Sequence, residues 1–282
     1  MKLDRATVRA IVAAALDEDL GSRGDLTSTA LIPANRRATA HLVARADLVL
    51  AGLPVACAVF QALDAQVEIR ALQDEGQAVA AGQRVASFEG RARALLGAER
   101  SALNFLMRLC GIASATRAAV EEVAGTGARI LDTRKTAPGL RHLDKYAVSV
   151  GGALNHRMGL HDAVMIKDTH LGVVGSVGRA VELALRAGHP AADITVEVDN
   201  VEQLGAAIEA GAGRALLDNM SLAELREAVR FGAGRIVLEA SGGLRPGRLR
   251  EVAETGVDVL SLGCLTHSAP SADLAMETEP SP

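Results

Sequence analysis

The apolar and polar positions of the first 124 residues follow three successive patterns. Residues 4–20 have the spacing of an amphipathic helix that ends near Gly21. Residues 38–90 contain short apolar runs separated by glycine-bearing turns, as in DEGQAVAAGQRVASFEG, which is typical of short strands. Residues 91–124 return to helical spacing, with Gly111 as a candidate break or kink. The pattern predicts a helix, a β-rich region and a long helix.

From about residue 128, short β-branched or aliphatic runs alternate with helical segments that glycines close. Alternating strands and helices predict parallel strands joined by right-handed crossovers. About six strands are predicted, which is fewer than the eight of a complete barrel. We therefore expect an incomplete α/β barrel, with an open doubly wound sheet as the alternative. The runs are RILDT, AVMIKD, ITVEVDN, ALLDNM, RIVLEAS and DVLSLG.

These patterns predict two domains and a tail, in agreement with the length of 282 residues. Residues 1–110 are expected to form an N-terminal α+β domain that is rich in strands. Residues 111–270 are expected to form the α/β barrel. Residues 271–282, which end in ETEPSP, are expected to be a loosely ordered tail.

Composition narrows the class of protein. Apolar residues make up 49% of the chain and charged residues 23%, which is typical of a globular core. The net charge of −4 argues against a nucleic-acid partner. The three cysteines are far apart, and no segment has the length or hydropathy of a secretory signal or a membrane span. We expect a cytoplasmic protein with no membrane or nucleic-acid partner.

Polar residues or glycine loops follow every predicted strand of the second half. In a barrel, the carboxyl ends of all parallel strands meet at one face, where the substrate sites of this architecture lie. Six such ends in series are difficult to explain as ordinary capping, so we expect one functional face. The groups are Asp132-Thr133-Arg134-Lys135, Lys167-Asp168, Glu197 with Asp199 and Asn200, Asp218-Asn219, Glu239 to Gly243, and Ser261 to Cys264.

The charges at these ends are separated by sign. Residues 132–170 carry a local charge of +2 and four of the seven histidines, so this segment is expected to face an anion. Only four lysines occur in the chain, and two of them, Lys135 and Lys167, lie at strand ends. The later acids Glu197 and Asp218 suit ribose hydroxyls or a hydrated Mg²⁺. Ser241-Gly242-Gly243 precedes a predicted helix, whose N-terminus would favour a phosphate, and Leu262-Gly263-Cys264 is the next such turn.

The run DTRKTAPGLRHLDKYAVSVGGALNHRMGLHDAVMIKDTHL at 132–171 resembles the quinolinate phosphoribosyltransferase family. AERSALNF, VEVDN, LLDNM, LEASGG and LSLGCLTHSAP add to the resemblance in the expected order. The resemblance implies a homodimer, with higher assembly left open, in which the N-terminal domain of one subunit closes the barrel site of the other. It also implies transfer of phosphoribosyl from phosphoribosyl pyrophosphate to quinolinate with Mg²⁺. The implied products are nicotinate mononucleotide, pyrophosphate and CO₂, on the route to NAD.

The resemblance also implies a role for each matching residue. Arg134, His156 and Arg157 would hold the quinolinate carboxylates, since arginine pairs with a carboxylate through two parallel hydrogen bonds. Arg100 would come from the partner subunit. The remaining substrate-binding residues carried over are Lys135 and Lys167 at the pyrophosphate, Glu197 and Asp218 at the ribose or hydrated Mg²⁺, Ser241, Gly242, Gly243 and Gly263 around the 5-phosphate, and Thr133, Leu262 and Cys264 elsewhere in the substrate site. Lys135, Lys167, Glu197 and Asp218 are the expected catalytic residues, and no direct metal ligand is expected.

Two alternatives remain open. Ala153 and Thr169 depart from the usual family pattern, so a paralogue with another acceptor, of the type associated with molybdate transport, is one alternative. A phosphosugar sensor without catalytic activity is the other, although it would have little reason to keep the four catalytic residues together. The remaining polar residues are expected to be structural: His142, His161, His170, Lys145, Tyr146, Asp199, Asn200, Asp25 and Thr27, with Cys264 as a small apolar filler.

Overall fold

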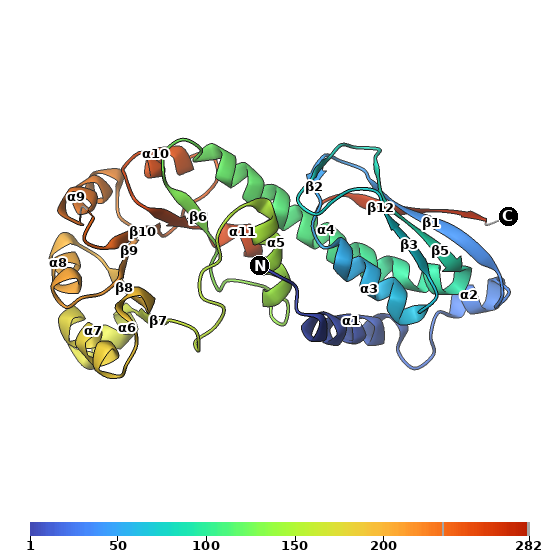
Figure 1. Ribbon diagram of the computed structural model, residues 1–282, viewed down its shortest axis with the longest axis horizontal. Coiled ribbons are helices and arrows are strands. Elements are labelled where there is room, and N and C mark those ends of the chain that lie inside the picture. The colour runs from blue at the N-terminus through green and yellow to red at the C-terminus, as the bar shows by residue number, and fades with distance from the viewer. Residues whose placement is uncertain (233, 281–282) are drawn as a thin grey trace. The chain divides into compact units, whose positions relative to one another are not determined.

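The computed structural model describes residues 1–232 and 234–280 (Figure 1). The contacts between Cα atoms divide the chain into two compact units. The first contains Met1–Arg117, Thr136–Gly152 and Ser268–Pro282, and the second contains Ala118–Lys135 and Ala153–His267. The domain boundary expected at residue 110 lies inside helix α4 (Ala92–Glu122).

The first unit is built on an antiparallel sheet of four strands in the order β12-β1-β5-β3. Phe60 of helix α3 stacks on Phe88 of strand β5 with ring centroids 4.0 Å apart, so that α3 covers one face of this sheet. The elements are α1 (Arg5–Leu20), α2 (Leu26–Leu31), β1 (Arg37–Ala44), β2 (Leu48–Val49), α3 (Leu53–Leu63), β3 (Glu68–Ala71), β4 (Ala78–Val79), β5 (Arg84–Arg91), α5 (Arg141–Gly151) and β12 (Leu274–Pro280).

The C-terminal segment differs from the expectation of a loose tail. Residues Leu274–Pro280 form β12, which pairs with β1 along seven residues. Gly111 shows why this segment can approach α4 closely: a Cβ atom at position 111 would lie 2.0 Å from the carbonyl oxygen of Pro270. The glycine therefore does not interrupt α4, which is continuous, but leaves room for the backbone near residue 270.

The second unit is a parallel sheet of six strands in the order β6-β11-β10-β9-β8-β7. From β7 to β11 each strand pairs with the next one along the chain, which is barrel-like winding rather than the reversal of a doubly wound sheet. β11 then pairs with β6, and a single bridge joins Leu131 of β6 to Leu154. The predicted incomplete α/β barrel of six strands is confirmed.

Helices α7, α8 and α9 lie in a row along the outer side of these strands (Figure 1). α8 packs on β8 and α9 on β10. No helix in the described ranges combines the length and hydropathy that crossing a bilayer requires. The elements are β6 (Arg129–Leu131), β7 (Val164–Ile166), α6 (Asp168–Val174), α7 (Val177–Arg186), a short 3-10 turn (Ala191–Asp193), β8 (Ile194–Val198), α8 (Val201–Glu209), β9 (Arg214–Asp218), α9 (Leu222–Gly232), β10 (Val237–Ser241), α10 (Leu249–Ala253), β11 (Val259–Ser261) and α11 (Cys264–His267).

Candidate active site

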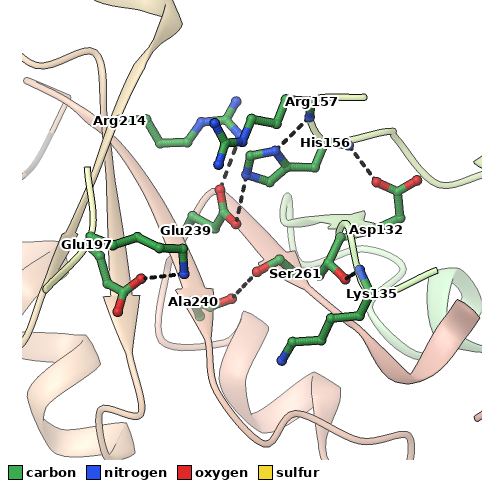
Figure 2. Close-up of polar contacts among 11 residues, drawn as sticks. Asp132, Lys135, His156, Arg157, Glu197, Arg214, Glu239, Ala240 and Ser261 are labelled. Carbon is green, nitrogen blue, oxygen red and sulfur yellow. Dashed lines mark hydrogen bonds and ion pairs between the residues drawn. The ribbon is translucent and has the colours of Figure 1, made fainter. Parts of the chain in front are cut away.

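The carboxyl ends of the six parallel strands carry nearly all of the predicted site residues, and all of these belong to the second unit. Figure 2 shows labelled residues from four of these strands, and from the loops after β6 and before β7, joined by hydrogen bonds and ion pairs. At this face Lys167 contacts Glu197 and His156 lies opposite Glu239, so basic residues from the middle of the chain meet carboxylates from later strands. The predicted residues placed here are Thr133, Arg134, Lys135, His156, Arg157, Lys167, Glu197, Asp218, Ser241, Gly242, Gly243, Leu262, Gly263 and Cys264.

The loop after β6 holds Lys135 through its backbone. The Lys135 nitrogen donates to the Thr133 hydroxyl at 3.0 Å, and the Lys135 carbonyl accepts from the Thr266 hydroxyl at 2.8 Å. The side chain lies across Gly263, because a Cβ atom at position 263 would be 2.9 Å from Lys135 Cδ. Lys135 is exposed, so its ammonium can reach an anionic ligand.

His156 and Arg157 are fixed by the backbone of the segment before β7. The His156 nitrogen donates to buried Asp132 at 2.7 Å, and the Arg157 nitrogen donates to His156 Nδ1 at 2.6 Å. Arg157 Nη1 donates to the Ala163 carbonyl at 2.9 Å. Figure 2 shows His156 between Arg157 and Glu239.

Arg157 keeps one buried donor for a ligand. Its Nε is buried and has no hydrogen-bond partner among the described residues. Burial lowers the pKa of the guanidinium and the neighbouring Arg134 lowers it further, while Asp162 opposes the change. Two guanidinium groups that repel each other, one with an unused N–H, are suited to a ligand with carboxylate groups.

Lys167, which follows β7, donates to Glu197 of β8, with Nζ 3.1 Å from Oε2. The Lys167 side chain is 45% exposed and that of Glu197 is 15% exposed, so this ion pair is open to solvent on the lysine side. An exposed ion pair of this kind contributes little to stability, which leaves both groups available to a charged ligand.

The turn after β10 approaches the end of β9 closely. Ser241 is in register with Asp218, and the nitrogen of Asn219 donates to the Ser241 carbonyl at 2.9 Å. Gly242 has φ +96°, and a Cβ atom there would lie 2.2 Å from Asn219 Oδ1. Only glycine fits this position, and its bare backbone can approach a phosphate.

The helix that was expected after this turn is present, but it does not begin at the two glycines. α10 begins at Leu249, so residues 244–248 separate the two glycines from the helix. Any phosphate binding at the turn must therefore rest on its own backbone N–H groups rather than on a helix N-terminus.

The next turn contributes through its backbone as well. The Leu262 side chain is fully buried, and its nitrogen donates to the Leu131 carbonyl at 2.9 Å. Burial raises the pKa of the Cys264 thiol, which agrees with the expected filler role and not with a reactive thiolate.

Two charged residues of the site were given no role from the sequence: Arg214 was not named, and Glu239 was named only within the group at the end of its strand. Arg214 at the start of β9 donates to fully buried Glu239 of β10, with Nη1 3.2 Å from Oε2. The other oxygen of Glu239 lies 3.8 Å from His156 Nε2. The available signal was an acid and an arginine inside otherwise apolar strands, RALLD and VLEAS.

The other residues that were discussed from the sequence either lie in the first unit or have structural contacts. Arg100 is exposed on α4 in the first unit. Tyr146 donates to Glu75 at 2.6 Å, and Asp25 and Asn200 cap α2 and α8, as expected for structural residues. His170 hydrogen-bonds the Lys167 nitrogen at the start of α6.

The described residues contain no group of three or more His, Cys, Asp or Glu side chains that could hold a metal ion directly. Glu197 and Asp218, on the adjacent strands β8 and β9, offer two carboxylates. This donor set fits a Mg²⁺ that keeps most of its water and is also held by substrate phosphates.

Comparison with known proteins gives consistent matches. A family model for the N-terminal domain of quinolinate phosphoribosyl transferase matches residues 25–110, and the model for its C-terminal domain matches residues 112–277. The probable nicotinate-nucleotide pyrophosphorylase [carboxylating] of Synechocystis sp. is 43% identical, covering 93% of this chain and 89% of its own. The nicotinate-nucleotide pyrophosphorylase [carboxylating] of Mycobacterium leprae is 42% identical, with 93% and 94% covered. The crystal structure of NadC from Streptococcus pyogenes superposes with a TM-score of 0.95 at 38% identity over all of both chains.

Proposed function

The chain belongs to the quinolinate phosphoribosyltransferase family, and we propose that the strand-end groups of its parallel sheet carry out that family's reaction. The protein is a pentosyltransferase that joins quinolinate to phosphoribosyl pyrophosphate. It gives nicotinate mononucleotide, pyrophosphate and CO₂ in NAD biosynthesis. The observation that carries the assignment of the site is the meeting of the mid-chain cations with Glu197, Asp218 and the two glycine turns at one face.

Recognition of the acceptor falls to Arg134, His156 and Arg157. Quinolinate has two adjacent carboxylates, and the unused N–H of Arg157 beside a second guanidinium offers donors that two carboxylates can share. Binding in this manner places the ring nitrogen, which is the nucleophile, toward the phosphoribosyl group. No protein nucleophile is then required, so catalysis rests on positioning and on charge.

The phosphoribosyl pyrophosphate lies over the remaining strand ends. The turns at Gly242 and Gly263 hold its 5-phosphate, and Glu197 and Asp218 accept hydrogen bonds from the ribose hydroxyls. Lys135 and Lys167 stabilise the pyrophosphate as the ring nitrogen forms its bond to the sugar and the bond to pyrophosphate breaks. Glu197 and Asp218 would hold a hydrated Mg²⁺, which would supply positive charge to the pyrophosphate.

The protein is a homodimer in the cytoplasm, in which Arg100 of one subunit completes the acceptor site of the other. The exposure of Arg100 on α4 supports this assignment, because the side chain is available to a second chain. An arginine at the edge of a site for a dicarboxylate would add a third guanidinium.

A steady-state assay with quinolinate, phosphoribosyl pyrophosphate and Mg²⁺ tests the proposal. We expect release of pyrophosphate and CO₂ in equal amounts. Absence of pyrophosphate release with quinolinate would exclude this acceptor and would favour a paralogue that uses another one.

A further inference from the structure

Glu239 is a buried acid that lies behind the acceptor-binding residues. Its side chain is fully buried in β10, with one oxygen 3.2 Å from Arg214 Nη1 and the other 3.8 Å from His156 Nε2 (Figure 2). The latter oxygen, Oε1, makes no hydrogen bond to any described residue. A buried carboxylate oxygen without a hydrogen bond is unusual and calls for a functional explanation.

The hydrogen bonds around His156 fix the position of its proton. Nδ1 accepts from the Arg157 backbone nitrogen at 2.6 Å, so this atom carries a lone pair and the proton lies on Nε2. Nε2–H therefore points toward Glu239, at a distance beyond that of a hydrogen bond. The Arg157 N–H at Nδ1 therefore opposes uptake of a second proton by His156.

Burial and the neighbouring polar groups act on the pKa of Glu239 in opposite directions. Burial raises the pKa of Glu239, whereas Ser261 of β11 and Arg214 of β9 lower it in part. His156 faces the carboxylate from the segment before β7. Arg134 and Arg157, which repel each other, are the cations that the acceptor would meet. When it is ionised, Glu239 is a counter-charge in a site rich in cations.

Building on the proposed function, we propose that Glu239 is a positioning residue that takes up a proton when the dicarboxylate acceptor binds. The incoming carboxylates add negative charge to a buried site that already holds one carboxylate, and this disfavours the ionised form of Glu239. The proton comes from solvent and goes to Glu239, because Nδ1 of His156 is occupied. Neutral Glu239 then no longer attracts Nε2–H, which can donate to the acceptor.

Calorimetric titration of the intact protein with quinolinate tests this coupling. The titration is repeated in buffers that differ in ionisation enthalpy, at two pH values on the acid side of neutrality, and gives the number of protons taken up for each acceptor bound. We expect a net uptake in the wild-type protein. In Glu239→Gln, which mimics the protonated side chain, the uptake is lost, whereas Glu202→Gln, an exposed change on α8, retains it.

A pH profile provides a second readout that a merely structural role would not alter. In the wild-type protein the KM for quinolinate rises as pH rises through the ionisation of Glu239. In Glu239→Gln this rise is absent, and the KM for phosphoribosyl pyrophosphate is unchanged in both proteins. Glu239→Ala, which leaves a cavity beside Arg214, loses acceptor affinity at every pH.

The outcomes separate this inference from the proposed function. If quinolinate does not bind to the wild-type protein, the proposed function fails. If quinolinate binds without proton uptake, or with equal uptake in the wild type and Glu239→Gln, the role of Glu239 is refuted and the proposed function stands.

Discussion

Asp132 accepts a hydrogen bond from the backbone nitrogen of His156 at 2.7 Å, and this contact fastens the loop after β6 to the segment that leads into β7. Its other oxygen accepts from Asn155 Nδ2, also at 2.7 Å. Only one bridge, Leu131 to Leu154, joins the backbone of this segment to β6. Asp132 therefore takes the place of the strand pairing that a complete barrel would have between β6 and β7. Its contact lies at His156, the first acceptor-binding residue of this segment.

Asp132→Asn should both destabilise the protein and weaken acceptor binding. Asparagine keeps one acceptor oxygen but places an NH₂ group where the aspartate accepts a bond, so one buried donor loses its partner. We expect a loss of about 1–3 kcal/mol in the free energy of unfolding, measured with urea. The KM for quinolinate should rise because His156 and Arg157 lose their anchor. Asp193→Asn, an exposed change in the same unit, should alter neither quantity.

Arg134→Ala and Arg157→Ala should raise the KM for quinolinate with little change in the KM for phosphoribosyl pyrophosphate. Each change removes a charged hydrogen bond worth about 1.5–3 kcal/mol. This corresponds to roughly tenfold to 100-fold in affinity. Arg179→Ala, an exposed arginine of α7, serves as the control. Wild-type acceptor affinity in both site variants would refute the assigned roles.

Lys135→Ala should mainly lower kcat. The ammonium is proposed to stabilise charge that develops on the departing pyrophosphate, and the loss of such a donor typically costs on the order of 100-fold in kcat. The measurement is the steady-state rate of pyrophosphate release at saturating substrates, and Lys2→Ala is the matched control. A rise in KM at constant kcat would show that Lys135 binds the substrate without acting on the transition state.

The sequence predicted the strands of the second unit and the side chains at their ends because both signals are local. An aliphatic run such as ITVEV predicts a strand, and the residue that follows it lies at the carboxyl end. The sheet order follows from the simplest right-handed connections, so convergence of Lys167 on Glu197 was predictable.

Contacts between distant residues could not be predicted in this way. Apolar and polar residues alternate only weakly along β12. The strand is held in place by pairing with β1, which lies more than two hundred residues earlier in the chain. In the sequence, Glu239 is a single acid within an apolar strand. The residues next to it in the sequence do not indicate that Arg214 and His156 are its partners. The position of Arg100 relative to a site in another chain is a property of assembly, which only the family resemblance suggested.

Gly242→Ala and Gly243→Ala should differ in severity although both glycines have positive φ. An L residue at either position incurs a backbone cost of about 1–2 kcal/mol. At position 242 the new methyl group would also overlap Asn219 Oδ1, whereas position 243 has no atom within 4 Å. We expect Gly242→Ala to lose more stability in urea unfolding and to raise the KM for phosphoribosyl pyrophosphate more strongly. Equal effects of the two substitutions would mean that the Asn219 side chain can move away from the new methyl group without a cost in free energy.

Mixing two inactive variants tests whether each active site is shared between subunits. If Arg100 acts in the partner's site, a mixed dimer of Arg100→Ala and Lys135→Ala contains one site with both lesions and one intact site. Activity should therefore return when the two proteins are mixed and allowed to exchange subunits. Arg134→Ala and Lys135→Ala both lie in a subunit's own site, so every site of their mixed dimer carries one lesion and activity should not return. If activity returns in neither mixture, Arg100 does not act in the partner's site. If activity returns in both mixtures, the effect of each substitution is not confined to a single site.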